Sequence, residues 1–180
     1  MAKKNLNRVY APVLAKAKPV GDRAERMKLA IDLLWDQFSI PIHPAEGAVD
    51  DEFHPTISWI GFYTKVDGAD EMILGPSRNK PACSPIGLHG VCGRCWKERR
   101  PVVVPDVATL GADYIACDPL DKSELCVPLL DDEGNCWGVL DADSYHTEAF
   151  DERDVTGMRM LLQRLDLTSK ASGDAETLWL

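Results

Sequence analysis

The segment that decides the fold is residues 123–144, SELCVPLLDDEGNCWGVLDADS. Two apolar runs flank the short polar segment DDEG, and this pattern predicts a β-hairpin. A turn of four residues, 131–134, fixes which residues lie opposite one another across the two strands. The expected pairs are Leu130 with Asn135, Pro128 with Trp137, Cys126 with Val139, and Glu124 with Asp141.

Three acidic residues gather at the open end of this hairpin. Opposed residues share a face and alternate residues return to it, so Glu124, Asp141 and Asp143 converge, while Trp137 and Val139 occupy the other end of that face. Like charges so placed destabilise a sheet unless a cation lies between them or one acid keeps its proton. Two simpler interpretations stay open. The aspartates only close a strand at the solvent edge, or an odd-length turn moves Glu124 to the opposite face.

Further strands and a set of helices surround the hairpin. Helices that bracket a run of short strands are typical of an α+β fold, with one mostly antiparallel sheet flanked by helices at both chain ends. The expected strands are 56–65, 71–76 and 101–105. The expected helices are 3–17, 22–38 with Asp22 as N-cap, a short one entered through Gly90, and 150–165 with Asp151 as N-cap.

These elements suggest one main domain with additions at each end. We expect an N-terminal helical region, 1–55, packed on the domain, with residues 39–55 as a loop. The main domain, which carries the candidate site, covers 56–167, and the tail 168–180 is expected to be loose.

The composition is that of a globular protein with an acidic balance. Of 180 residues, 45% are hydrophobic and 27% are charged, and the formal net charge is −9. Such a chain lacks the cationic face that duplex nucleic acid and anionic membranes require, so neither is an expected partner. The N-terminus has no long apolar segment typical of a secretory signal, and no window is long enough to span a membrane. A cytoplasmic location is expected.

Six cysteines carry the question of function. In a reducing cytoplasm they act as buried structural thiols, metal ligands or redox catalysts rather than as structural disulfides. Cys83, Cys92 and Cys117 lie in loops or at element ends, whereas Cys126 and Cys136 lie mid-strand and are expected to be small core residues. Because a helix dipole favours a thiolate at its N-terminus, the position of Cys92 predicts a lowered thiol pKa.

A zinc module is one alternative. Cys92 and Cys95 form a CxxC pair, and His89 and Cys83 are close enough in the sequence to complete a set of four ligands. One such pair without a second is a weak signal, so neither a metal nor a cofactor is expected. The chain also lacks the glycine-rich loop of a nucleotide-binding site.

Taken in order, the motifs resemble a known family. They are WIGFY (59–63), NKPAC (79–83), GVCG (90–93), PDV (105–107), IACD (115–118), SE (123–124) and GVLDADS (138–144). This series, over about residues 56–165, resembles the GAF-domain free methionine-(R)-sulfoxide reductases. The resemblance implies a GAF-like fold and an oxidoreductase active against oxidative stress, which reduces free methionine-(R)-sulfoxide through a cysteine sulfenic acid and a disulfide. A thioredoxin-type dithiol is the implied reductant.

The resemblance also implies roles for eight residues. The cysteines it assigns to catalysis are Cys117, which attacks the sulfoxide, and the two resolving positions Cys83 and Cys92. The residues it assigns to the substrate are the acids Glu124, Asp141 and Asp143, and the pocket aromatics Trp59 and Tyr63. Independently of the family, these two aromatics lie four positions apart on an expected strand and therefore share a face.

Some features depart from the family pattern. The loop SPIGLHGVCG is shorter, the stretch before Cys117 is longer, and Cys95 is additional, so whether Cys83, Cys92 or Cys95 resolves the sulfenic acid stays open. The main rival is a non-catalytic GAF domain that binds a small molecule as a sensor. A pure sensor has no need of three loop thiols. Assembly as a homodimer is also left open.

Overall fold

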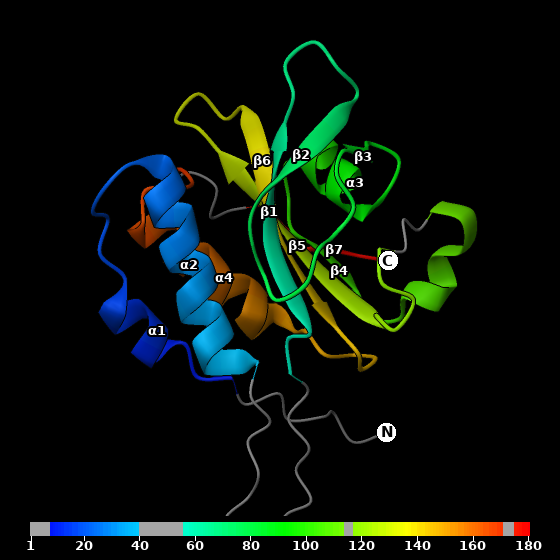
Figure 1. Cartoon of the computed structure of the whole chain (residues 1–180), viewed down its shortest axis with the longest axis horizontal. Helices are drawn as coiled ribbons and strands as arrows, with labels where there is room; N and C mark the ends of the chain where they lie inside the picture. Colours follow the sequence, from blue (N-terminus) through cyan, green and yellow to red (C-terminus); the bar gives the residue numbers. More distant parts are fainter. Residues whose placement is uncertain (1–7, 40–55, 114–116, 171–174) are drawn as a thin grey trace, which may run out of the picture.

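The computed structural model describes residues 8–39, 56–113, 117–170 and 175–180. Its centre is a seven-stranded sheet with the order β3-β2-β1-β6-β5-β4-β7 (Figure 1). Neighbouring strands are antiparallel except for β4 and β7, which run parallel, so the predicted α+β class with a mostly antiparallel sheet is confirmed. The strands are β1 (Trp59–Lys65), β2 (Glu71–Arg78), β3 (Ile86–Gly87), β4 (Val102–Val104), β5 (Ser123–Leu130), β6 (Cys136–Ser144) and β7 (Leu178–Trp179).

The α-helices are α1 (Ala11–Lys16), α2 (Arg23–Phe38), α3 (Val91–Glu98) and α4 (Glu152–Arg164), and a 3-10 segment covers Val107–Asp113. The predicted N-caps are confirmed. The Asp22 carboxylate accepts a hydrogen bond from the Glu25 amide at 2.9 Å, and the Asp151 carboxylate accepts one from the Arg153 amide at 2.7 Å. The helix expected at 3–17 is shorter in the described part, beginning at Ala11, and most of the loop expected at 39–55 lies outside the described residues.

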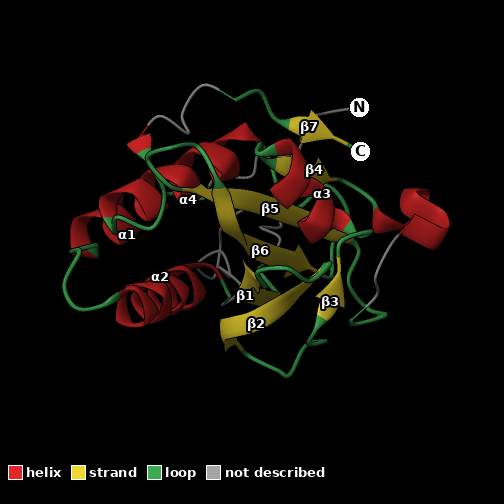
Figure 2. Cartoon of the chain, turned by 90° about the horizontal axis from the view of Figure 1, so that it is seen from above, coloured by secondary structure: helices red, strands yellow, loops and turns green. Residues whose placement is uncertain are grey.

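The sheet separates two apolar clusters. In Figures 1 and 2, α1, α2 and α4 gather on one side of it and α3 lies on the other. Successive side chains of a strand point to opposite faces, so the continuous apolar strands fill both clusters. The side chains toward α1, α2 and α4 include Ile60, Phe62, Leu125, Val127, Leu140 and Ala142. Those toward α3 include Trp59, Tyr63, Cys126 and Val139.

The hairpin that decides the fold forms, but its register differs from the prediction. The turn is longer by one residue, and Leu130 lies opposite Cys136 rather than Asn135. A bulge then follows, because Leu129 already pairs with Gly138 and leaves Trp137 as the extra residue. Together the two changes displace every outer pair by two positions. The outer pairs are Pro128 with Val139, Cys126 with Asp141, and Glu124 with Asp143.

The displacement by two keeps the predicted faces except at the bulge itself. Glu124, Asp141 and Asp143 still share one face, because a shift of two positions preserves the alternation. The placement of Trp137 on that face is wrong. The bulge turns its side chain to the opposite side, where it packs against the larger cluster and lies under the Arg23 guanidinium, 4.5 Å from the ring centroid.

Described residues near both termini contact the body of the fold. The Arg8 guanidinium and the Tyr10 hydroxyl donate to the buried Asp154 carboxylate of α4 at 2.7 and 2.8 Å. The expectation of a loose tail is wrong for its last residues, since Leu178–Trp179 extend the sheet beside β4. Within the described residues, none of the helices has the length and apolar character needed to cross a membrane.

Candidate active site

A pocket opens on the α3 side of the sheet, where β1, β6 and β5 lie next to one another. Across the β1–β6 pair, Trp59 lies opposite Asp143 and Gly61 lies opposite Asp141, so the predicted aromatic face and the predicted acid face are the same surface. Seven of the eight predicted site residues line the pocket. They are Trp59, Tyr63, Cys92, Cys117, Glu124, Asp141 and Asp143. The eighth, Cys83, lies in the loop beside the pocket mouth.

Gly61 makes room for the aromatic wall. It lies between Trp59 and Tyr63 on the same face, and a Cβ at this position would lie only 2.4 Å from the end of the Trp59 ring. The indole instead leans across the glycine, and its centroid comes to 6.1 Å from that of Tyr63. Both rings are almost completely buried. The position of this glycine midway between two expected pocket aromatics is the one signal in the sequence that points to its role.

The same aromatics hold the loop that carries Cys83. The Trp59 indole N–H donates to the Lys80 carbonyl oxygen at 3.1 Å, and the Tyr63 hydroxyl donates to the Cys83 carbonyl oxygen at 2.9 Å. Their polar tips thereby fix one side of the pocket mouth, while their rings form its apolar wall.

The pKa values of the acid cluster are raised. Burial, followed by the charges of its acidic neighbours, raises the pKa of Glu124 well above its usual range. The same causes raise the pKa of Asp143, and burial raises the pKa of Asp141 to about 7. These raised pKa values favour one of the two predicted ways to relieve opposed acids, namely retention of a proton. The alternative that the aspartates only close a strand at the solvent edge is wrong for Asp141, which is buried.

A fourth acid and a lysine complete the charge pattern, and sequence reasoning missed both. Asp121 is buried, and its carboxylate accepts a hydrogen bond from the Ser58 hydroxyl at 3.0 Å. Lys80 pairs with Asp118 and donates to the Tyr145 hydroxyl at 2.7 Å. Because Asp118 directly follows Cys117, this ion pair connects the Cys117 loop with the Cys83 loop. Asp121 and Lys80 lie in loops without a periodic sequence pattern, so their side-chain directions could not be predicted from the sequence.

The Cys117 thiol faces the Cys83 loop. Desolvation, then a hydrogen bond with the Cys83 thiol, raises the pKa of Cys117 to about 12, and the negative charge of Asp141 contributes in the same direction. The free site therefore holds Cys117 as a thiol. Both Cys83 and Cys117 are exposed residues.

Cys92 behaves differently from its prediction. Its pKa is raised, not lowered, by a hydrogen bond with Cys126, by burial and by the charge of Asp141. The Sγ atoms of Cys92 and Cys126 lie 3.9 Å apart. These effects outweigh the dipole of the short helix α3. The prediction that Cys126 is a core residue is confirmed, whereas Cys136 is only half-buried.

The zinc set inferred from sequence is not brought together in the described part of the chain. Two groups of three side chains have ligand atoms within 4.8 Å of one another, and none of His89, Cys83 and Cys95 belongs to either. The first group is Cys92, Cys126 and Asp141. The second is Glu124, Asp141 and Asp143.

The family resemblance is supported by comparison with known proteins. The GAF domain profile matches residues 47–165. The crystal structure of free methionine-R-sulfoxide reductase from Neisseria meningitidis, in complex with its substrate, superposes with a TM-score of 0.69 at 32% identity, covering 91% of this chain and 89% of that one. This chain belongs to the GAF-domain free methionine-R-sulfoxide reductase family. The resemblance inferred from the motifs is therefore confirmed.

Among the other relatives, some are named as reductases and one is named as a GAF sensor protein. The free methionine-R-sulfoxide reductase of Saccharomyces cerevisiae is 40% identical over 112 residues, which are 61% of this chain and 62% of that protein. The chain therefore spans less than two thirds of the yeast protein. A putative GAF sensor protein from Burkholderia vietnamiensis superposes with a TM-score of 0.70 at 30% identity, covering 92% of this chain and 96% of that one.

Proposed function

We propose that this chain reduces free methionine-(R)-sulfoxide to methionine, with Cys117 as the attacking sulfur. The observation that carries the proposal is the meeting of a thiol with proton-bearing carboxyl groups in one pocket, beside a second thiol at its mouth. The names of the reductase relatives point to the same substrate.

The acid cluster selects a free amino acid. An ammonium group placed against Glu124, Asp141 and Asp143 lets one of these buried groups ionise, since an opposite charge favours the charged form, while the others stay protonated. A peptide-linked methionine sulfoxide has no ammonium group to offer. The methyl end of the substrate packs on the wall formed by Trp59 and Tyr63.

The chemical step moves one oxygen atom. The Cys117 sulfur attacks the sulfoxide sulfur and forms a transient S–S bond. The oxygen then passes from the substrate sulfur to the Cys117 sulfur as the substrate S–O bond and the S–S bond break, which releases methionine and leaves Cys117 as a sulfenic acid. A carboxylic acid of the cluster protonates the departing oxygen and regains a proton from the Cys117 thiol. Binding of the ammonium favours this step, because it offsets the Asp141 charge that helps to keep the Cys117 pKa high.

The resting thiol is restored through a disulfide. The Cys83 thiol attacks the sulfenic acid, water leaves, and a Cys83–Cys117 disulfide forms. A thioredoxin-type dithiol then supplies two electrons and two protons by exchange, which suits a cytoplasmic setting. The contact between Cys83 and Cys117 favours Cys83 as the resolving residue, whereas Cys92 is buried against Cys126.

A sensor GAF domain is the second candidate, because one structural relative is named as such. A sensor needs the pocket but not the thiols. Turnover and thiol loss therefore separate the two candidates.

The proposal is tested with thioredoxin, thioredoxin reductase and NADPH. Free L-methionine-(R)-sulfoxide is compared with its N-acetyl derivative, which keeps the sulfoxide and lacks the ammonium group. Loss of a charged hydrogen bond costs about 1.5–3 kcal/mol, so kcat/KM should fall by roughly 10- to 150-fold with the acetylated substrate. The Cys117→Ser variant should be inactive with both. Absence of NADPH oxidation with the free substrate, or turnover by Cys117→Ser, contradicts the proposal.

A further inference from the structure

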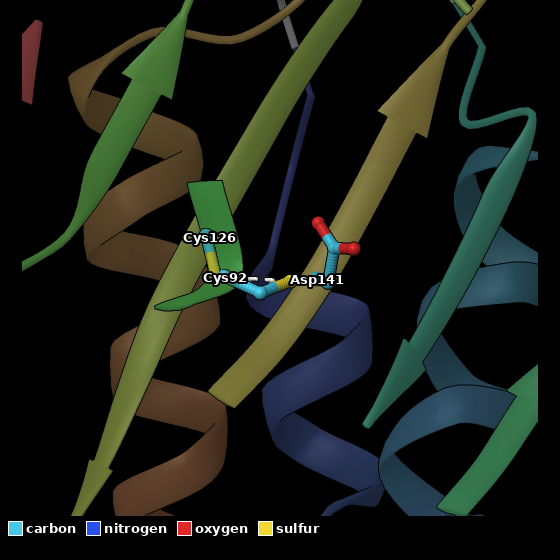
Figure 3. A group of neighbouring side chains, drawn as sticks. All are labelled: Cys92, Cys126 and Asp141. Carbon is cyan, nitrogen blue, oxygen red and sulfur yellow. Dashed lines mark hydrogen bonds between the residues drawn. The ribbon is translucent and has the colours of Figure 1, made fainter. Parts of the chain in front are cut away.

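A compact group of potential metal ligands lies at the floor of the pocket. Cys92 from α3, Cys126 from β5 and Asp141 from β6 each place one ligand atom within 4.8 Å of the other two, although they are far apart in the sequence (Figure 3). Their exposed fractions are 5%, 0% and 7%. Direct pairing of Cys126 with Asp141 across the β5–β6 ladder fixes two of the three positions.

The spacing suits a tetrahedral thiolate-binding ion. Zinc–sulfur bonds of about 2.3 Å place two thiolates of one tetrahedral site about 3.8 Å apart. The Cys92 and Cys126 sulfurs are 3.9 Å apart. The Asp141 carboxylate is a second, independent indication of a metal site. Its Oδ1 atom is buried without a hydrogen-bond partner among the described residues and is therefore available as a ligand. A buried oxygen without a partner is costly unless something binds it.

The surroundings favour a cation. The second ligand group, Glu124, Asp141 and Asp143, shares Asp141 with the first and adds two more carboxyl groups beside it. The hydrogen bond between the two thiols, followed by burial, raises the pKa of Cys92, whereas burial raises the pKa of Cys126 and is a larger effect there than the same hydrogen bond, which lowers it. In the free protein both groups are therefore thiols. A bound ion would displace these protons, so its affinity should increase with pH.

We propose that Cys92, Cys126 and Asp141 form a binding site for a thiophilic cation of the Zn²⁺ type. Three protein ligands leave one coordination position open toward the pocket, which Cys92 and Asp141 line. The bound ion occupies Asp141 and closes the substrate site, and it therefore inhibits the reductase. The inhibition rests on the proposed function, but metal binding itself does not.

Binding is measured first in a Cys83→Ser/Cys117→Ser background, which removes the two exposed pocket thiols as competing ligands. Co²⁺ is titrated into this reduced protein, and Zn²⁺ then displaces it. We expect one Co²⁺ per chain with a thiolate-to-cobalt absorption band. Cys126→Val, which preserves an apolar strand residue, should weaken binding by at least about a hundredfold, since even changes behind the ligands cost 10- to 100-fold.

The matched control is Cys136→Ala, which removes a half-buried thiol that lies outside the ligand group and donates to the Gly138 carbonyl oxygen, and it should change the affinity only a few-fold. If Cys126→Val does not fold, Asp141→Asn tests the same site with a nearly identical side-chain shape. A missing thiolate band, or unchanged affinity in the variant that removes a ligand, overturns the inference.

Inhibition is measured next in the chain with all other cysteines intact. Zn²⁺ should reduce turnover reversibly, with recovery on chelation, and Cys126→Val should keep its basal activity and lose most of this sensitivity. Equal inhibition of the parent and Cys126→Val would place the effect at other thiols and overturn the inhibitory role. Metal binding without any reductase activity in the parent would instead contradict the proposed function and leave the metal site supported.

Discussion

Replacement of Asp141 by asparagine should make the protein more stable at neutral pH while it damages the site. Burial raises the pKa of this carboxyl group from 3.8 to about 7 in the folded chain. Between these values the folded state binds a proton that the unfolded state has lost, so the free energy of unfolding falls as the pH rises. Above about pH 7 both states are ionised and the decline ends. Asparagine keeps the shape of the side chain and does not titrate.

The size of the effect follows from the same two values. Each pKa unit corresponds to 1.36 kcal/mol, so a rise from 3.8 to about 7 amounts to about 4 kcal/mol. This is an upper limit, because Glu124 and Asp143 adjust their own protonation when Asp141 ionises. For a chain of this length, 4 kcal/mol is a change of roughly 10 °C in Tm.

The assay is urea unfolding followed by tryptophan fluorescence, from pH 4 to pH 8.5 under reducing conditions. The difference in unfolding free energy between Asp141→Asn and the parent should move in favour of the variant by up to about 4 kcal/mol across this range. The exposed turn residue Asp132 provides the control Asp132→Asn, which should track the parent. A constant offset between Asp141→Asn and the parent at every pH would refute the reasoning.

Two further predictions concern the second thiol and the N-terminal anchor. Cys83→Ser should still make about one methionine per chain in a single turnover and then stall with thioredoxin, as a chain that cannot form the Cys83–Cys117 disulfide must. Undiminished multiple turnover by this variant would remove Cys83 from the relay. Asp154→Ala should lower the free energy of unfolding by roughly 3 kcal/mol, because it leaves the buried Arg8 guanidinium without its carboxylate. A loss below about 1 kcal/mol in urea unfolding would show that the pair is not an anchor.

Local patterns in the sequence were sufficient for most of the fold. The capped helices and the hairpin follow from short-range rules, since Asp22, Asp151 and the DDEG turn act within a few residues of themselves. The register was displaced because the bulge at Trp137 depends on how that ring packs against the helices, which no strand pattern encodes.

The sequence was sufficient to predict which site residues share a face of the sheet, but not the pKa of Cys92 or the positions of Lys80 and Asp121. The alternation placed the acids on one face even in the wrong register, because a displacement by two positions changes partners but not faces. The raised pKa of Cys92 was missed, since it depends on Cys126, a residue of another element brought beside it only by the fold. Lys80 and Asp121 lie in irregular segments, where spacing carries no information about direction.

The β7 strand was missed for a related reason. Its residues Leu178 and Trp179 form too short a run to predict a strand, and their pairing depends on the free edge of β4. Edge strands of this length gain their order from the neighbouring strand.

The central claim is that Cys117 takes the oxygen from free methionine sulfoxide and that a second thiol resolves the product. The most direct test is a single turnover: the fully reduced chain is mixed with free L-methionine-(R)-sulfoxide without any reductant, and methionine and free thiols are counted. The account predicts one methionine formed and two thiols lost per chain, with the disulfide mapped to Cys83 and Cys117. Bound substrate with no methionine formed and all thiols intact would contradict it and identify a ligand-binding domain.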